Sequence, residues 1–106
     1  MTDFTDMLSK AKEMQKKMKE AQDAIKNIEV VGESGGNLVK VVLSGDYELK
    51  SIVVSDEAKK EDREIINDLI IAAYNNAKEK LKRKSSEELS KITGGLNLPP
   101  DFKLPF

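Results

Sequence analysis

Residues 28–55 read IEVVGESGGNLVKVVLSGDYELKSIVVS, three short runs of Val, Ile and Leu separated by glycine turns. Short β-branched runs bounded by glycine are typical of strands, and tight turns between them predict an antiparallel meander. The first turn is expected at residues 33–36. The second is expected at Gly45-Asp46, as a two-residue type II′ hairpin that places Ser44 opposite Tyr47.

This register divides the side chains of the meander between two faces, and both faces are largely apolar. One face is expected to carry Leu38, Val42, Leu49 and Val53. A domain of 106 residues can cover one face with its own helices, but the second face then needs another partner. The simplest partner is a second copy of the chain. The expected dimer interface consists of Val39, Val41, Leu43, Ile52 and Val54.

Amphipathic helices are predicted on both sides of the meander. Over residues 3–28 a heptad seam places apolar residues at spacings of three and four: Phe4, Met7, Ala11, Met14, Met18, Ala21, Ile25 and Ile28. Over residues 61–92 a broader stripe should cover one face of the sheet: Ile65, Ile66, Leu69, Ile70, Ala73, Tyr74, Ala77 and Leu81. The expected fold is α+β: one domain over residues 1–106, with helix, three-stranded antiparallel meander, long helix and extended tail.

The tail, residues 94–106, reads GGLNLPPDFKLPF. Gly94 and Gly95 stop the second helix, and the three prolines hold the backbone extended. The leucines and phenylalanines of the tail are apolar and are expected to pack against another surface. We therefore expect the tail to be docked, either as a strap over the body or the partner subunit, or as a peptide-like handle for another protein.

The composition excludes several classes of function. The chain has no cysteine and no histidine, which removes thiol chemistry, the commonest general base and the commonest metal ligand. We therefore expect neither an enzyme nor a bound metal, cofactor or small-molecule substrate. The N-terminus lacks a basic start followed by an apolar run, and no apolar stretch approaches membrane-spanning length. These features predict a protein of the cytoplasm that has no membrane partner.

The charge is segregated along the chain although the formal net charge is only −1. Residues 78–84 hold five basic side chains against Glu79, and residues 56–68 are mainly acidic. The first helix carries further lysines away from its seam. These basic residues have two interpretations, a solvated face with neighbouring ion pairs or a set of contacts to a polyanion.

The sequence resembles the YbaB/EbfC family of small bacterial nucleoid-associated proteins over essentially its whole length. The most specific match is the C-terminal pattern of Gly94, Gly95, Pro99, Pro100, Phe102, Pro105 and Phe106, in which Asp101 stands where glycine is usual. Further matches are Met14-Gln15, residues 32–36 ahead of Val39-Lys40-Val41, and residues 68–73. Asn37 stands where a third glycine is common.

This resemblance implies a homodimer joined through its sheets, with helices that project like the arms of tweezers and bind double-stranded DNA in the nucleoid. The implied contacts are basic residues of both helices: Lys10, Lys12, Lys16, Lys17, Lys19, Lys78, Lys80, Lys82, Arg83 and Lys84. Lysine is a point-charge contact to phosphate, so weak sequence discrimination is expected. The alternative is a scaffold or chaperone-like protein whose helical arms grip a protein client, with the methionines of the seam in an open cleft.

Overall fold

The computed structural model describes residues 3–93. Helix α1 (Asp3–Lys26) leads into strands β1 (Glu29–Ser34), β2 (Val39–Ser44) and β3 (Leu49–Val54). A short 3₁₀ turn, η1 (Ala58–Lys60), then precedes the long helix α2 (Arg63–Thr93). The predicted helix, three-stranded sheet and long helix are confirmed. The tail and its docking lie outside the described residues.

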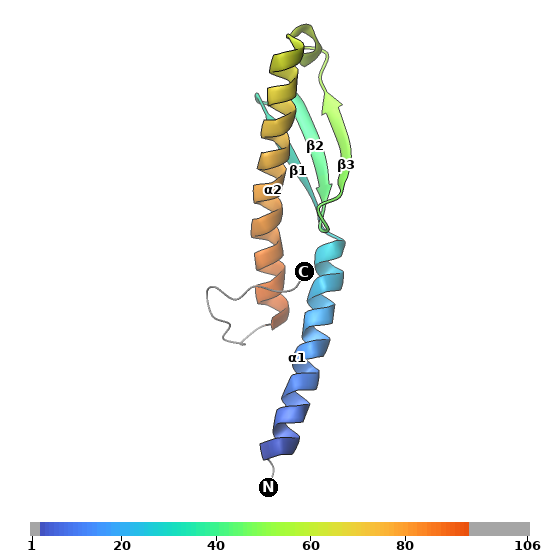
Figure 1. Cartoon of the computed structure of the whole chain (residues 1–106), viewed down its shortest axis with the longest axis vertical. Coiled ribbons are helices and arrows are strands. Elements are labelled where there is room, and N and C mark those ends of the chain that lie inside the picture. Colours follow the sequence, from blue (N-terminus) through green and yellow to red (C-terminus); the bar gives the residue numbers. More distant parts are fainter. Residues whose placement is uncertain (1–2, 94–106) are drawn as a thin grey trace.

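The sheet is an antiparallel meander in the order β1-β2-β3. Helix α2 lies along one of its faces, and α1 extends away from the sheet beside the second half of α2 (Figure 1). The molecule is therefore elongated, with a longest extent of 73 Å. Neither helix of residues 3–93 is long and apolar enough to cross a membrane.

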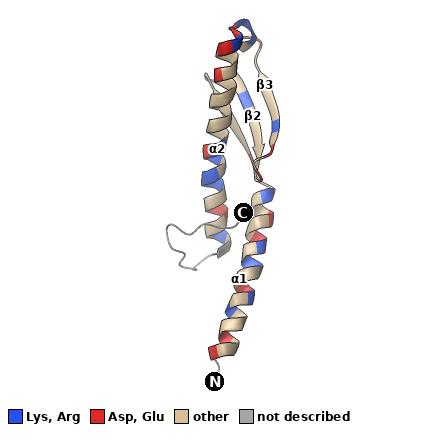
Figure 2. Ribbon diagram, viewed as in Figure 1, with Lys and Arg blue, Asp and Glu red and all other residues tan. Residues whose placement is uncertain are grey.

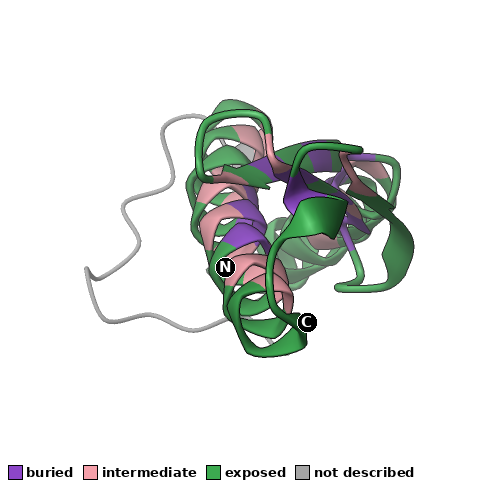
Figure 3. Cartoon of the chain, turned by 90° about the horizontal axis from the view of Figure 1, so that it is seen from above, coloured by how far each residue is buried: buried purple, intermediate pink, exposed green. Residues whose placement is uncertain are grey.

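The core lies between α2 and the strands β1 and β2 (Figure 3). Its sheet side is formed by Val30, Val39, Val41 and Leu43, and its helix side includes Ala73, Ala77 and Leu81. Gly32 lies opposite Ala73 and Ala77, where a Cβ atom would overlap the backbone of the helix. The small residues on both elements therefore let helix and strand approach closely.

Three of the five residues of the predicted dimer interface lie in the core of the single chain. Val39, Val41 and Leu43 are completely buried inside the single chain, because α2 covers their face of β1 and β2. Ile52, which pairs with Val41 across the same face, keeps 44% of its surface exposed. Val54 is half-buried. Helix α2 thus covers the first two strands and leaves β3 largely uncovered.

The predicted two-residue hairpin between β2 and β3 is wrong. The Ser44 amide donates to the Glu48 carbonyl at 2.9 Å, and the Tyr47 amide donates to the Ser44 carbonyl at 2.9 Å, so the loop has three residues. Tyr47 takes the left-handed conformation, with φ of 63°. A turn followed by a left-handed residue is the usual geometry of a three-residue hairpin. The accompanying register shift pairs Leu49 with Leu43, on the face opposite to the one expected.

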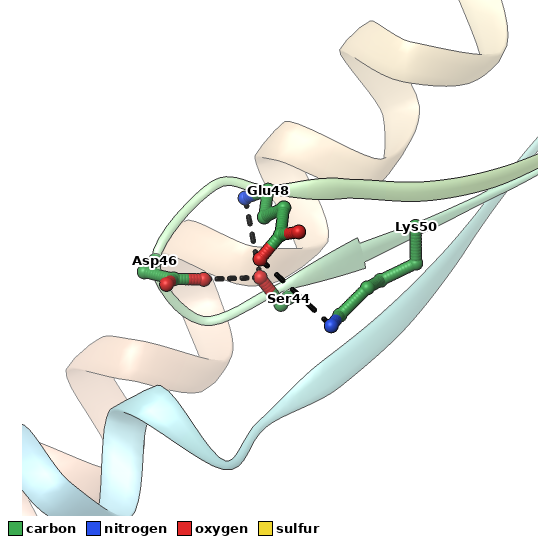
Figure 4. Close-up of polar contacts among 4 residues, drawn as sticks. All are labelled: Ser44, Asp46, Glu48 and Lys50. Carbon is green, nitrogen blue, oxygen red and sulfur yellow. Dashed lines mark hydrogen bonds and ion pairs between the residues drawn. The ribbon is translucent and has the colours of Figure 1, made fainter.

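The role of Gly45 explains this difference. A Cβ atom at Gly45 would overlap the backbone carbonyl of Ile25 at the end of α1. Glycine is required at position 45 because α1 approaches the hairpin closely there. Its presence therefore does not indicate a particular type of turn. Side chains then complete the loop: the Ser44 hydroxyl hydrogen-bonds Asp46 and accepts from the Glu48 amide at 3.1 Å (Figure 4).

Candidate nucleic-acid interface

The solvent-facing side of α1 carries a row of three lysines, Lys12, Lys16 and Lys19, which we call the lysine row. Their spacing of four and three residues places them on one face of the helix. This face lies opposite the apolar seam. All three side chains are exposed, and none forms an ion pair with a carboxylate of residues 3–93.

The other two candidate lysines of α1 lie on a different side of the helix. Lys17 pairs with Glu13 at 3.4 Å, one turn earlier. Lys10 lies on the same side by its spacing, seven residues before Lys17 and three before Glu13. An acidic neighbour reduces the positive field of this side. The lysine row is therefore the part of α1 best suited to hold an anion.

The basic residues of α2 do not form one surface. Lys80, Arg83 and Lys84 lie on one side of the helix by their spacing of three and four, whereas Lys78 and Lys82 lie on another. Lys82 also pairs with Glu79 at 3.9 Å. Figure 2 shows the basic residues of α2 interspersed with acidic ones. Of these five residues, only Arg83 and Lys84 are exposed and form no ion pair among the described residues.

Lys80 has a structural role that the sequence did not indicate. Its ammonium group donates a hydrogen bond to the backbone carbonyl of Val31 in β1, at 2.9 Å. Two residues along, the Glu33 amide donates to the Asn76 side chain at 3.0 Å. Two side chains of α2 therefore satisfy backbone groups on the outer edge of β1, and this edge is protected from pairing with another strand.

Two basic residues extend the candidate surfaces beyond the predicted set. Lys26 lies seven residues after Lys19, on the same side of α1, and is exposed. Lys91 lies seven residues after Lys84 and pairs with Glu88 at 3.7 Å. Continuing the heptad spacing from the predicted lysines would have found both positions.

The described residues contain no constellation typical of an active site. Among them, no group of three or more carboxylates could hold a metal ion. The hydrogen bond from the Ser44 hydroxyl lowers the pKa of the Asp46 carboxyl from its ordinary value of 3.8. This pair fixes the β2–β3 turn, so its role is structural.

Comparison with known proteins identifies the family. The sequence profile of the YbaB/EbfC DNA-binding family matches residues 1–96. A nucleoid-associated protein of Mesorhizobium japonicum is 47% identical over 107 residues, and one of Brucella ovis is 48% identical; each alignment covers the whole of both chains.

A solved structure supports the fold independently. An uncharacterized protein of Helicobacter pylori superposes with a TM-score of 0.71 at 20% sequence identity, over 89% of this chain and all of that chain. The family profile and the relatives agree along the chain from α1 to the end of α2. The chain is therefore a member of the YbaB/EbfC family of nucleoid-associated DNA-binding proteins.

Proposed function

We propose that the protein binds double-stranded DNA as a homodimer, with low sequence specificity, through the lysine row of α1. The observation that carries this proposal is the row itself: three exposed lysines on one helical face, without ion-pair partners among the described residues. Arg83 and Lys84 on α2 are the secondary contacts. The place of action is the nucleoid, in the cytoplasm.

The chemistry of the row favours the phosphate backbone over the bases. Each lysine offers a compact charge without the planar, bidentate geometry that reads guanine. The chain as a whole carries a net charge of −1, so attraction to DNA must come from this local surface. Because phosphates are the same at every base pair, the row provides affinity without sequence discrimination.

The proposed dimer forms along β3. The β1 edge is occupied by Lys80 and Asn76. Strand β3, in contrast, has no second partner strand among residues 3–93 and carries the exposed apolar side chains Leu49, Ile52 and Val53. An exposed apolar edge strand is a template for pairing with another strand. Of the five predicted interface residues, Ile52 and Val54 remain in this proposal. Two copies would present two lysine rows.

DNA binding is tested by fluorescence anisotropy on two unrelated duplexes, with a pair of charge-matched variants. Lys16→Glu/Lys19→Glu reverses two charges of the row, and the control Lys59→Glu/Lys60→Glu reverses two at η1, at the other end of the molecule (Figure 1). Loss of binding in the first variant alone supports the row as the contact. Equal losses in both would show that only net charge matters, and unchanged binding in both would refute the row.

The dimer is tested separately by sedimentation equilibrium. Ile52→Glu places a charge on the β3 surface, and the matched control Ile71→Glu changes a comparably exposed isoleucine of α2. We expect Ile52→Glu to dissociate the dimer and Ile71→Glu to leave it intact. A wild-type protein that sediments as a monomer would contradict the proposal directly.

A protein-binding scaffold is the second candidate, and exposed methionines on α1 favour it. Met7 is 67% exposed and Met14 is 38% exposed, and Met side chains adapt to varied apolar partners. Its test is the suppression of aggregation of a thermally unfolded reporter protein by the wild type and by Met7→Lys/Met14→Lys. Suppression that the double variant loses would favour the scaffold over the DNA-binding function.

A further inference from the structure

The first half of α1 has no tertiary cover among the described residues. Every residue from Asp3 to Lys16 is exposed, and cover begins only at Lys17 and Met18. A helix of this length, without packing of its apolar face, is marginally stable in water. The helix therefore needs a partner for its apolar side.

That side carries a continuous apolar stripe: Phe4, Met7, Leu8, Ala11 and Met14. Phe4 is 72% exposed and Met7 is 67% exposed, and both values are among the highest for large apolar side chains in the described part of the chain. The stripe continues the heptad seam whose second half, around Ala21 and Ile25, is buried. Within the described residues, only the second half of this apolar surface of α1 is therefore packed against other elements.

The end of α2 lies beside the start of this uncovered stripe. The two helices run in opposite directions, and α2 ends at Thr93 while α1 continues toward its N-terminus (Figure 1). A chain that leaves α2 in its own direction therefore passes along the exposed half of α1. Residues 94–106 are the residues that follow.

We propose that residues 96–106 of the same chain bind along the apolar stripe of α1. This segment, LNLPPDFKLPF, alternates large apolar residues with polar ones and contains three prolines, which favour an extended backbone. Eleven extended residues span up to about 35 Å. The uncovered half of α1 is about 20 Å long, so the segment can cover it completely.

The proposed binding would bring the apolar side chains of the segment and those of the α1 stripe together in a second small core. It also stabilises the helical segment whose opposite side carries Lys12 and Lys16. Prolines reduce the conformational entropy that the segment loses on binding. The proposal does not depend on DNA binding, because it concerns only contacts within the chain.

Paramagnetic relaxation enhancement tests the placement in the full-length protein. Because the natural chain has no cysteine, Lys103→Cys gives a single site for a nitroxide label between the apolar positions. We expect broadening of the amide signals of residues 4–14 when label and ¹⁵N are on the same chain. Broadening elsewhere, or none, would overturn the proposal. A second sample mixes spin-labelled chains with ¹⁵N-labelled chains that carry no spin label. If the signals of residues 4–14 are broadened only in this mixed sample, the segment comes from a second copy and the intrachain proposal is overturned.

A pair of matched variants provides an independent readout by amide hydrogen exchange. Phe102→Ser/Leu104→Ser removes two apolar side chains, and Asp101→Ser/Lys103→Ser changes their polar neighbours by the same number of substitutions. The first variant should accelerate exchange in residues 3–16 by roughly tenfold, and the second should leave it unchanged. Equal exchange in both variants would contradict the contact. Exchange in the sheet serves as the control for global folding.

Discussion

The Lys80 ammonium group lies 2.9 Å from the backbone carbonyl of Val31 and donates a hydrogen bond to it. This bond joins the middle of α2 to the outer edge of β1, beside the bond between Asn76 and the Glu33 amide. A lysine in a basic cluster is usually interpreted as a ligand for an anion. Here its position on the side of α2 that faces β1 gives it a partner within the fold.

Replacing Lys80 should therefore affect stability before it affects DNA binding. We expect Lys80→Ala to lower the free energy of unfolding by about 1–2 kcal/mol, because the Val31 carbonyl loses a charged donor. Lys84→Ala, which removes an exposed lysine of the same helix, should change stability by less than about 0.5 kcal/mol. Urea unfolding at one fixed protein concentration measures both. Equal stabilities would show that water replaces the lost bond.

Gly32→Ala should be among the most destabilising single substitutions. The added methyl group would overlap the backbone of Ala73 and Ala77, so α2 would have to move away from β1. We expect a loss of about 3 kcal/mol or more, as for other overpacked cores. A suitable comparison is Gly36→Ala, whose Cβ meets no atom but whose φ of 75° carries a backbone cost of about 1 kcal/mol. Similar losses in thermal unfolding would contradict the close contact.

The left-handed Tyr47 predicts a stabilising substitution. A non-glycine residue with positive φ carries backbone strain, so Tyr47→Gly should raise stability by up to about 1 kcal/mol. The ring is 45% exposed, so little buried area is lost with it. Differential scanning calorimetry at constant concentration measures the effect. A lower melting temperature would instead show that the ring has a contact outside the single chain.

The Ser44–Asp46 pair predicts a dependence of the hairpin on acid pH. Because the hydroxyl of Ser44 lowers the pKa of Asp46 in the folded chain, the pair contributes stability above pH 3.8, and this contribution is lost as pH falls through the lowered value. Asp46→Asn should remove this part of the acid dependence. Amide exchange of Tyr47 and Glu48 between pH 3 and pH 6 provides the measurement. Identical profiles for variant and wild type would contradict the assignment.

Local patterns in the sequence predicted the helices and strands. Tertiary contacts determined two features that these patterns did not predict, the sheet face that α2 covers and the type of the β2–β3 hairpin. The heptad seam of α1 and the apolar stripe of α2 define helices from neighbouring residues alone, and both were found. The sheet face covered by α2 depends on Gly32 meeting Ala73 and Ala77, three small residues from distant segments. The hairpin type depends on Gly45 meeting the carbonyl of Ile25. Neither contact can be recognised from neighbouring residues in the sequence, because each joins segments that are distant in the chain.

The same limit applies to the candidate site. Charge and spacing located the lysines, but ten candidate contacts cannot be ranked until their partners are known. The structure assigns Lys80 to Val31, Lys17 to Glu13 and Lys82 to Glu79, and it leaves the lysine row exposed. Partners three or four residues away could be inferred from the sequence. The partner of Lys80 lies 49 residues away and could not.

The lysine row makes a quantitative prediction for salt dependence. If each subunit of a dimer contacts DNA with three lysines, about six phosphates are neutralised, and log affinity should fall with log salt at a slope near −5. Lys16→Ala removes one contact per subunit, so the slope should become shallower by about 2, equally on two unrelated duplexes. Lys59→Ala, at η1, should leave the slope unchanged. Anisotropy titrations at several salt concentrations measure all three proteins. A flat slope in the wild type, or an unaltered slope in Lys16→Ala, would exclude the lysine row as the source of the affinity. The reason is that the number of counterions released from DNA is proportional to the number of phosphate contacts.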